Sequence, residues 1–149
     1  MLHLAYLGEA KKLHIKDDAL KLFIVRKPTK IIPQGFIHTP QLSPSIELFN
    51  AAMRWKKGDF SPKEESWIRK QNFNKDRDNL WWELYKIKFN IEINKRVDMR
   101  KALNRLEEVL KEGKEVYLFC FCKDTCKCHR ILIGKYIEER GYKVNYRTP

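Results

Sequence analysis

The sequence VYLFCFCKDTCKCHRILIGKYIEERG, residues 116–141, contains the pattern that decides the fold. Residues 116–119 form an apolar run of β-branched and aromatic side chains after Gly113, which predicts a buried strand. From Ile131 to Ile137 apolar residues recur at helical spacing, and Gly141 is placed to end that helix. The segment between them, which holds all four cysteines of the chain, is predicted to be the loop of a strand-loop-helix elbow.

Such an elbow predicts a site, because open α/β sheets bind their ligands at the carboxyl ends of their strands. The first turn of the following helix offers free N–H groups and the positive end of the helix dipole. Both would stabilise a thiolate or an anionic ligand.

The rest of the chain predicts more strands and helices around this elbow. Strands are predicted at residues 2–7, at 20–25, ending before Pro28, and at 142–146 as an edge. Helices are predicted to begin at Ser43 as cap, at Ser61 with a capping box, near Leu80 and at Asp98 as cap. The predicted fold is α/β: a single three-layer domain over residues 1–149, Rossmann-like, with a short and mainly parallel sheet.

Composition and charge limit the classes of function. The 149 residues are 43% hydrophobic, enough for one core, and no apolar run approaches the roughly 20 residues of a membrane span. The N-terminus lacks the basic region and cleavage site of a signal peptide, so a cytoplasmic protein without a membrane partner is expected. The formal net charge of +12 favours polyanionic partners, a nucleotide or nucleic acid above all.

Three stretches resemble a known family. LFCF at residues 118–121, KD at 123–124 and CHR at 128–130 resemble the C-terminal signature of the bacterial domain-of-unknown-function family four-eight-eight. LFIVRKP at 22–28 resembles its early strand ending in an arginine, and QLSPSIEL at 41–48 resembles its Leu-x-Pro-Ser helix start. The sequence departs from the family where Cys122 replaces an acidic residue and Cys126 adds a thiol. The resemblance implies a fold more readily than a reaction.

A cysteine-centred enzyme is the first functional hypothesis. Cys128, at the helix start, Cys120 and His129 are the candidate catalytic residues, because a thiolate there would be stabilised by the dipole and nearby cations. The spacing does not match the Cys-x5-Arg loop of cysteine phosphatases. Candidate ligands for an anionic substrate are Arg26, Arg130, His38 and Ser45.

The position of Arg26 matters most among these predicted ligands. If residues 20–25 lie parallel to 116–120, Arg26 and the elbow share one sheet edge. The loop over residues 29–44, which holds His38, would then form one wall of a site for a nucleotide, nucleic acid or related phosphorylated molecule.

Three alternatives remain open. A non-enzymatic module could bind nucleic acid or a partner protein through its basic surface, with the cysteines as structural residues. No cofactor is predicted, but Zn²⁺ or Cu(I) is possible, with soft ligands in Cys-x-Cys-x3-Cys-x-Cys-His. These ligands would be Cys120, Cys122, Cys126, Cys128 and His129. A reversible redox pair could join Cys126 to Cys122 or to Cys128.

The four tryptophans lie among lysines and arginines, an arrangement that could stack bases. Helical aromatic residues are more often core, and about three of the four are expected to be buried. Trp82 is the one expected nearest the surface.

Overall fold

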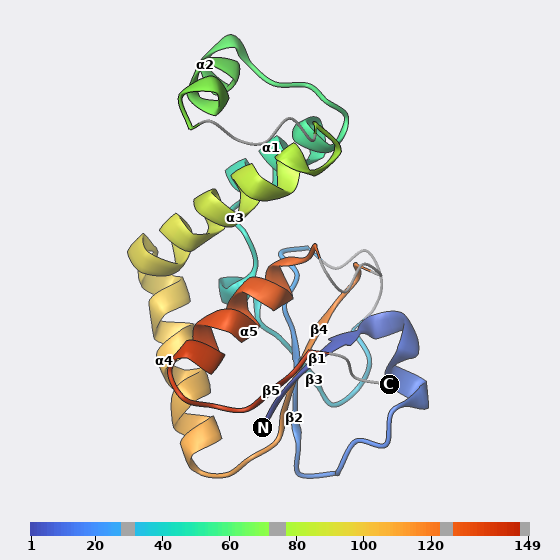
Figure 1. The fold of residues 1–149 in the computed structure, drawn as a ribbon. Helices are drawn as coiled ribbons and strands as arrows, with labels where there is room; N and C mark the ends of the chain where they lie inside the picture. Colours follow the sequence, from blue (N-terminus) through green and yellow to red (C-terminus); the bar gives the residue numbers. More distant parts are fainter. Residues whose placement is uncertain (28–31, 72–76, 123–126, 147–149) are drawn as a thin grey trace.

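The computed structural model describes the chain except residues 28–31, 72–76, 123–126 and 147–149 (Figure 1). Its strands form one five-stranded sheet in the order β3-β2-β4-β1-β5. The strands are β1 (Leu2–Tyr6), β2 (Leu20–Phe23), β3 (Phe36–His38), β4 (Val116–Cys120) and β5 (Val144–Asn145). All four strand pairings are parallel, which confirms the predicted α/β fold and its mainly parallel sheet.

The sheet is organised around β4, whose five residues are all buried. Its two neighbours keep one register, since Leu4 of β1 and Leu22 of β2 both lie opposite Leu118. β1 and β2 therefore end at the same edge of the sheet as Cys120. The predicted juxtaposition of Arg26 with the elbow follows from this parallel arrangement.

Both faces of the sheet are covered, as in a three-layer domain. Val116, Leu118 and Cys120 point to one face and join the large core built with the helices. Tyr117 and Phe119 point to the other face, where a smaller cluster packs under the 3₁₀ helix η1 (Leu7–Lys12). The alternation along β4 thus divides the core into two layers of side chains.

Five α-helices complete the described part of the chain: α1 (Ile46–Lys56), α2 (Pro62–Lys70), α3 (Arg77–Lys95), α4 (Val97–Lys111) and α5 (His129–Glu139). Figure 1 shows α4 and α5 beside the sheet, with α1 and α2 at the far end of α3. The capping box of Ser61 and Glu64 is confirmed at α2.

Two predicted helix caps are wrong. Ser45, not Ser43, caps α1: its hydroxyl accepts a hydrogen bond from Leu48 N, whereas the Ser43 hydroxyl donates to the Pro40 carbonyl. At α4 the N-cap residue is Arg96, and Asp98 lies in the first helical turn. Neither side chain is available to cap a helix, because the Ser43 hydroxyl bonds to the Pro40 carbonyl and the Asp98 carboxylate pairs with Arg96.

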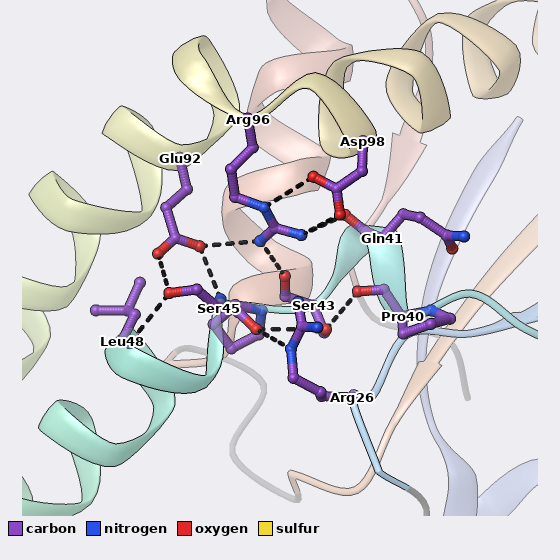
Figure 2. Close-up of polar contacts among 10 residues, drawn as sticks. Arg26, Pro40, Gln41, Ser43, Ser45, Leu48, Glu92, Arg96 and Asp98 are labelled. Carbon is purple, nitrogen blue, oxygen red and sulfur yellow. Dashed lines mark hydrogen bonds and ion pairs between the residues drawn. The ribbon is translucent and has the colours of Figure 1, made fainter.

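Arg96, at the junction of α3 and α4, holds the segment that leads into α1 (Figure 2). Its guanidinium donates to the carbonyls of Ser43 (2.7 Å) and Gln41 (3.3 Å) and to the carboxylates of Glu92 and Asp98. Glu92 in turn accepts hydrogen bonds from the backbone and hydroxyl of Ser45. This network fixes residues 41–45, which pass beside the site described next.

Candidate thiol site

Three thiols meet where β4 ends and α5 begins. The Sγ atoms of Cys120 and Cys128 are 3.0 Å apart, and the backbone N–H of Cys122 donates to Cys120 Sγ at 3.2 Å. Cys120 is 1% exposed and Cys128 is 3% exposed, whereas Cys122 is partly exposed. Cys126, a candidate ligand from the sequence, lies outside the described residues. The elbow therefore presents two buried thiols and one accessible thiol.

The ring of His129 has a fixed orientation beside these thiols. Its Nε2 lies 2.7 Å from the Ile24 carbonyl, which can only accept, so Nε2 carries the hydrogen. Burial lowers the pKa of His129, which keeps the ring neutral. Nδ1 is then an acceptor, and it lies 3.7 Å from Cys128 Sγ. Nδ1 of His129 therefore faces the Cys128 thiol as a hydrogen-bond acceptor.

The electrostatics of the cluster favour one thiolate, on Cys122. Hydrogen bonds with Cys120 and Cys128 hold the pKa of Cys122 far below its ordinary value, and the positive charge of Lys56 adds to this effect. The hydrogen bond to Cys122 raises the pKa of Cys120 to about 11. The pKa of Cys128 also rises, because it hydrogen-bonds to both other thiols and is buried. These shifts favour a negative charge on Cys122 over one on Cys120 or Cys128.

A cavity of about 460 Å³ opens over the cluster. Cys120, Cys122, Cys128 and His129 contribute to its lining. The apolar part of the wall is formed by Val25, Pro44, Ile46, Phe49, Ala52, Met53, Trp81, Tyr85 and Phe121, and the cations around it are Arg26, Lys27, Lys56 and Lys127. No carboxylate belongs to the lining that the described residues form. The site is therefore apolar and aromatic in its walls and positive in its charged groups.

The predicted ligands of an anionic substrate fall into two groups. Arg26 lines the cavity, with its Nε donating to the Pro44 carbonyl at 2.8 Å. Arg130, His38 and Ser45 do not line it. His38 Nε2 bonds the Val25 carbonyl at 2.6 Å, and Ser45 is held by Glu92. The Arg130 side chain is 1% exposed, with Nη1 donating to the Cys122 carbonyl and Nε without a described partner.

Comparison with known proteins places the chain in a family. Residues 5–141 match the family model DUF488-N3a, described as the active DUF488-N3 subclade. The chain belongs to the DUF488 family. Neither the curated proteins nor the solved structures that were compared match it. The resemblance inferred from the sequence is thus confirmed at the level of the family.

Within this DUF488 protein, Cys122 stands where the resemblance implies an acidic residue. The pKa of the Cys122 thiol is lowered, mainly by its interactions with Cys120 and Cys128, which favours a negative charge at this position.

Several lining residues of the DUF488 site were missed from the sequence. Trp81, rather than Trp82, faces the cavity: Trp82 is 8% exposed, lies outside the lining and stacks on Tyr85. Lys56 Nζ lies over the Trp81 ring, 4.6 Å from its centroid. The spacing of Trp81 and Tyr85, one helical turn apart, was the signal that could have shown a shared face.

The apolar face of α1 was a second missed signal. Ile46, Phe49 and Met53 recur at i, i+3 and i+7, a spacing that predicts a core-facing stripe. All three are exposed and line the cavity instead. Apolar side chains that are exposed at a cavity, rather than packed in the core, indicate a ligand-binding surface.

A metal ion is a further possibility at the thiol cluster. One donor atom each from Cys120, Cys128 and His129 lie within 4.8 Å of one another. Thiolate and imidazole donors are the ligands that Zn²⁺ takes in proteins, so this group could hold that ion. Cys122, which the sequence also offered as a ligand, does not belong to this group of three.

Proposed function

We propose that this DUF488 protein is an enzyme that acts on a nucleotide or a related phosphorylated molecule bound in the cavity. The observation that carries the proposal is the combination in one cavity of aromatic walls, four cations and one accessible thiolate. The description of the matching model as an active subclade also favours an enzyme over a non-enzymatic module.

The cavity supports this class of ligand by its size and by its composition. Its volume of about 460 Å³ lies within the range of small-molecule sites. Trp81, Tyr85 and Phe121 offer rings for a planar base, and Arg26 and Lys127 offer charge for a phosphate. Because no described lining residue is a carboxylate, the four cations outnumber the one negative group of the wall, the Cys122 thiolate.

Cys122 is the reactive group in this proposal, in place of Cys128, the nucleophile expected from the sequence. It is the accessible thiol and the one whose pKa is lowered. Its sulfur would form a bond to an electrophilic carbon or phosphorus while the bond to the leaving group breaks. The backbone N–H of Cys122 donates to Cys120 Sγ at 3.2 Å, which fixes the backbone of the reactive residue. Reduced thiols of this kind fit the cytoplasm.

Nucleotide binding tests the proposal directly. Purified protein is titrated with mixed nucleoside mono- and triphosphates, and tryptophan fluorescence and alkylation of Cys122 by iodoacetamide are followed. Binding should quench Trp81, protect Cys122 and weaken with salt. Lys56→Ala should weaken binding by roughly tenfold, since it removes one desolvated cation at a ring.

Lys88→Ala is the matched control for Lys56→Ala. Lys88 Nζ lies over the Trp67 ring at 5.6 Å, and neither residue lines the cavity. Its substitution should leave nucleotide affinity unchanged. If no nucleotide or short oligonucleotide protects Cys122, the substrate class is wrong. Full biological activity of Cys122→Ser would instead favour the non-enzymatic module.

The group of two thiols and one histidine favours zinc binding as the second candidate function. Cys120, Cys128 and His129 would supply two sulfur donors and one nitrogen donor of the kind found in zinc sites. Metal analysis of protein purified without chelator tests it. One zinc per chain that is lost in Cys120→Ser would support it, and a metal-free chain with three reactive thiols would exclude it.

A further inference from the structure

We propose that the cavity binds a short single strand of nucleic acid, with a phosphate at each end of the cavity and the bases on the apolar wall between them. Such a ligand is one kind of phosphorylated nucleotide ligand, so it rests on the proposed function and narrows it. The four cations of the lining support it by their positions, because they divide between two ends of one wall.

Helices α1 and α3 form this wall and run antiparallel to each other. At one end, Ser45, the N-cap of α1, donates its backbone N–H to Glu92 near the end of α3 at 2.8 Å. At the other end, Lys56, the last residue of α1, lies over the ring of Trp81 near the start of α3. Because α1 rises about 1.5 Å per residue over its 11 residues, these two ends lie about 15 Å apart.

Two of the cations lie at the Ser45 end of the wall. Arg26 Nε donates to the carbonyl of Pro44, directly before α1, and Figure 2 shows this guanidinium beside the start of the helix. Lys27 is its neighbour in the chain, and its side chain is exposed and lines the cavity. The pair Arg26 and Lys27 therefore forms one positive end of the cavity.

The other two cations lie at the Trp81 end. Lys56 Nζ is 4.6 Å from the centroid of the Trp81 ring. Lys127 comes from the loop before α5, and its Nζ donates to Asn79 Oδ1, two residues before Trp81. Both lysines line the cavity. The pair Lys56 and Lys127 therefore forms the second positive end.

The wall between the two positive ends is apolar. Ile46, Phe49 and Met53 of α1 are exposed along it, and Trp81 and Tyr85 of α3 line the same cavity. Apolar and aromatic side chains accept the faces of bases whatever their identity. The order along the wall is thus cation, apolar surface, cation, which matches phosphate, base, phosphate in a single strand.

A mononucleotide satisfies only part of this wall. Its phosphates lie on one side of its base, so it can neutralise one positive end and leaves the other without an anion. A strand with one phosphate per about 3.4 Å of axis spans 15 Å with roughly four stacked nucleotides, or with fewer when the bases are unstacked. A duplex is disfavoured, because its paired and stacked bases cannot lie on the wall.

A length series tests the proposal on the full chain. The protein is titrated with 5′-phosphorylated thymidine oligonucleotides of one to six residues, and tryptophan fluorescence gives the affinities at several salt concentrations. We expect affinity to rise roughly tenfold or more from one to four residues and then to level off. The magnitude of the slope of log affinity against log salt should rise by at least about 0.7, the value for one further phosphate neutralised on a single strand.

Lys27→Ala and Lys101→Ala are the matched variants, since each removes one lysine from an exposed position. Lys27 lies at the Arg26 end of the cavity, and its substitution leaves the hydrogen bond from Arg26 to Pro44 in place. It should lower the ratio of tetranucleotide to mononucleotide affinity by roughly threefold to tenfold. Lys101 is on α4 and outside the lining, so Lys101→Ala should change this ratio less than twofold.

Equal affinity and equal salt dependence for one and four residues would overturn the proposal and leave the proposed nucleotide function standing. Affinity that keeps growing in proportion to length through six residues would also overturn it, because surface charge alone would then explain binding. So would equal effects of the two lysine variants. Failure of every length to bind would remove the proposed function itself. The length series on the parent chain decides the matter if a variant fails to fold.

Discussion

Arg96 and Arg26 donate hydrogen bonds to adjacent backbone carbonyls. Arg96 Nη1 binds the carbonyl of Ser43 at 2.7 Å, and Arg26 Nε binds that of Pro44 at 2.8 Å (Figure 2). One arginine comes from the α3–α4 junction and the other lines the cavity. These two hydrogen bonds fix the segment between η2 (Pro40–Leu42) and α1. The position of Arg26 at the cavity depends on the bond to Pro44.

Substitution of Arg96 by Met should therefore destabilise the protein. The change leaves Glu92 and two carbonyls without their charged donor, and we expect a loss of about 2–4 kcal/mol in the free energy of unfolding. Urea denaturation measures it. The control is Arg105→Met, which removes an exposed ion pair with Glu108 and should cost less than about 1 kcal/mol. Equal effects of the two substitutions would contradict the network's role.

The same network predicts a dependence of stability on pH. The hydrogen bond from Arg96 holds the pKa of Asp98 below its usual value. A carboxylate with a lowered folded-state pKa stabilises the fold above the unfolded value of about 3.9, and that stability is lost as pH falls through the folded pKa. Asp98→Asn should flatten the decline in stability below about pH 4. In the Arg96→Met background the same substitution should have a smaller effect, because the backbone hydrogen bond of Met99 and the charge of Arg26 then remain as the causes of the lowered pKa.

The thiolate on Cys122 predicts an alkylation profile that a normal cysteine would not give. Between about pH 6 and 8 the rate at Cys122 should change little, because its thiolate is already formed. In the urea-unfolded chain the rate at the same residue should rise about tenfold per pH unit over this range, following an ordinary pKa near 8.5. Peptide mapping after iodoacetamide treatment measures both. A native profile that follows the unfolded one would remove the basis for Cys122 as the reactive group.

Gly134 on α5 lies in a tightly packed position, where an added side chain is predicted to bring no gain in stability. A Cβ atom there would lie 2.9 Å from Leu4 Cδ1 and 3.1 Å from Tyr146 Cε1. Although alanine is the better helix former by about 1 kcal/mol, overpacking costs about 1–3 kcal/mol, so Gly134→Ala should be neutral to destabilising in urea. Ser66→Ala on the exposed face of α2 isolates the propensity effect and should be mildly stabilising. Stabilisation by Gly134→Ala comparable to that by Ser66→Ala would contradict the close packing of α5 on the sheet.

The parallel sheet could be predicted because its signal is local. A short apolar run predicts the strand that ends at Cys120, and single glycines predict where α4 and α5 end. The cap of α1 could not be predicted in the same way. Ser43 and Ser45 are equivalent as cap residues, and the choice is made by Glu92, 47 residues away from Ser45.

The candidate site could also be predicted only as far as local sequence patterns reach. The parallel strands that bring Arg26 to the cysteines followed from the strand pattern, whereas the wall formed by α1 and α3 depends on how two helices pack. Trp81 and Trp82 are adjacent in sequence, and only the helix orientation decides which one reaches the cavity. The division of charge among the thiols is also invisible in sequence, because it follows from distances between sulfur atoms.

No helix in the described ranges is long and apolar enough to cross a membrane. The localisation to the cytoplasm stays a prediction.

The strand order has a consequence for synthesis on the ribosome. β1 is made first, yet its two partners in the sheet are β4 and β5, which are made last. At about 5–20 residues per second, β1 waits roughly 5–20 s for β4 to be translated. During that time its apolar side chains are open to other nascent chains and to chaperones, and the thiol cluster cannot form until nearly the whole protein has been made.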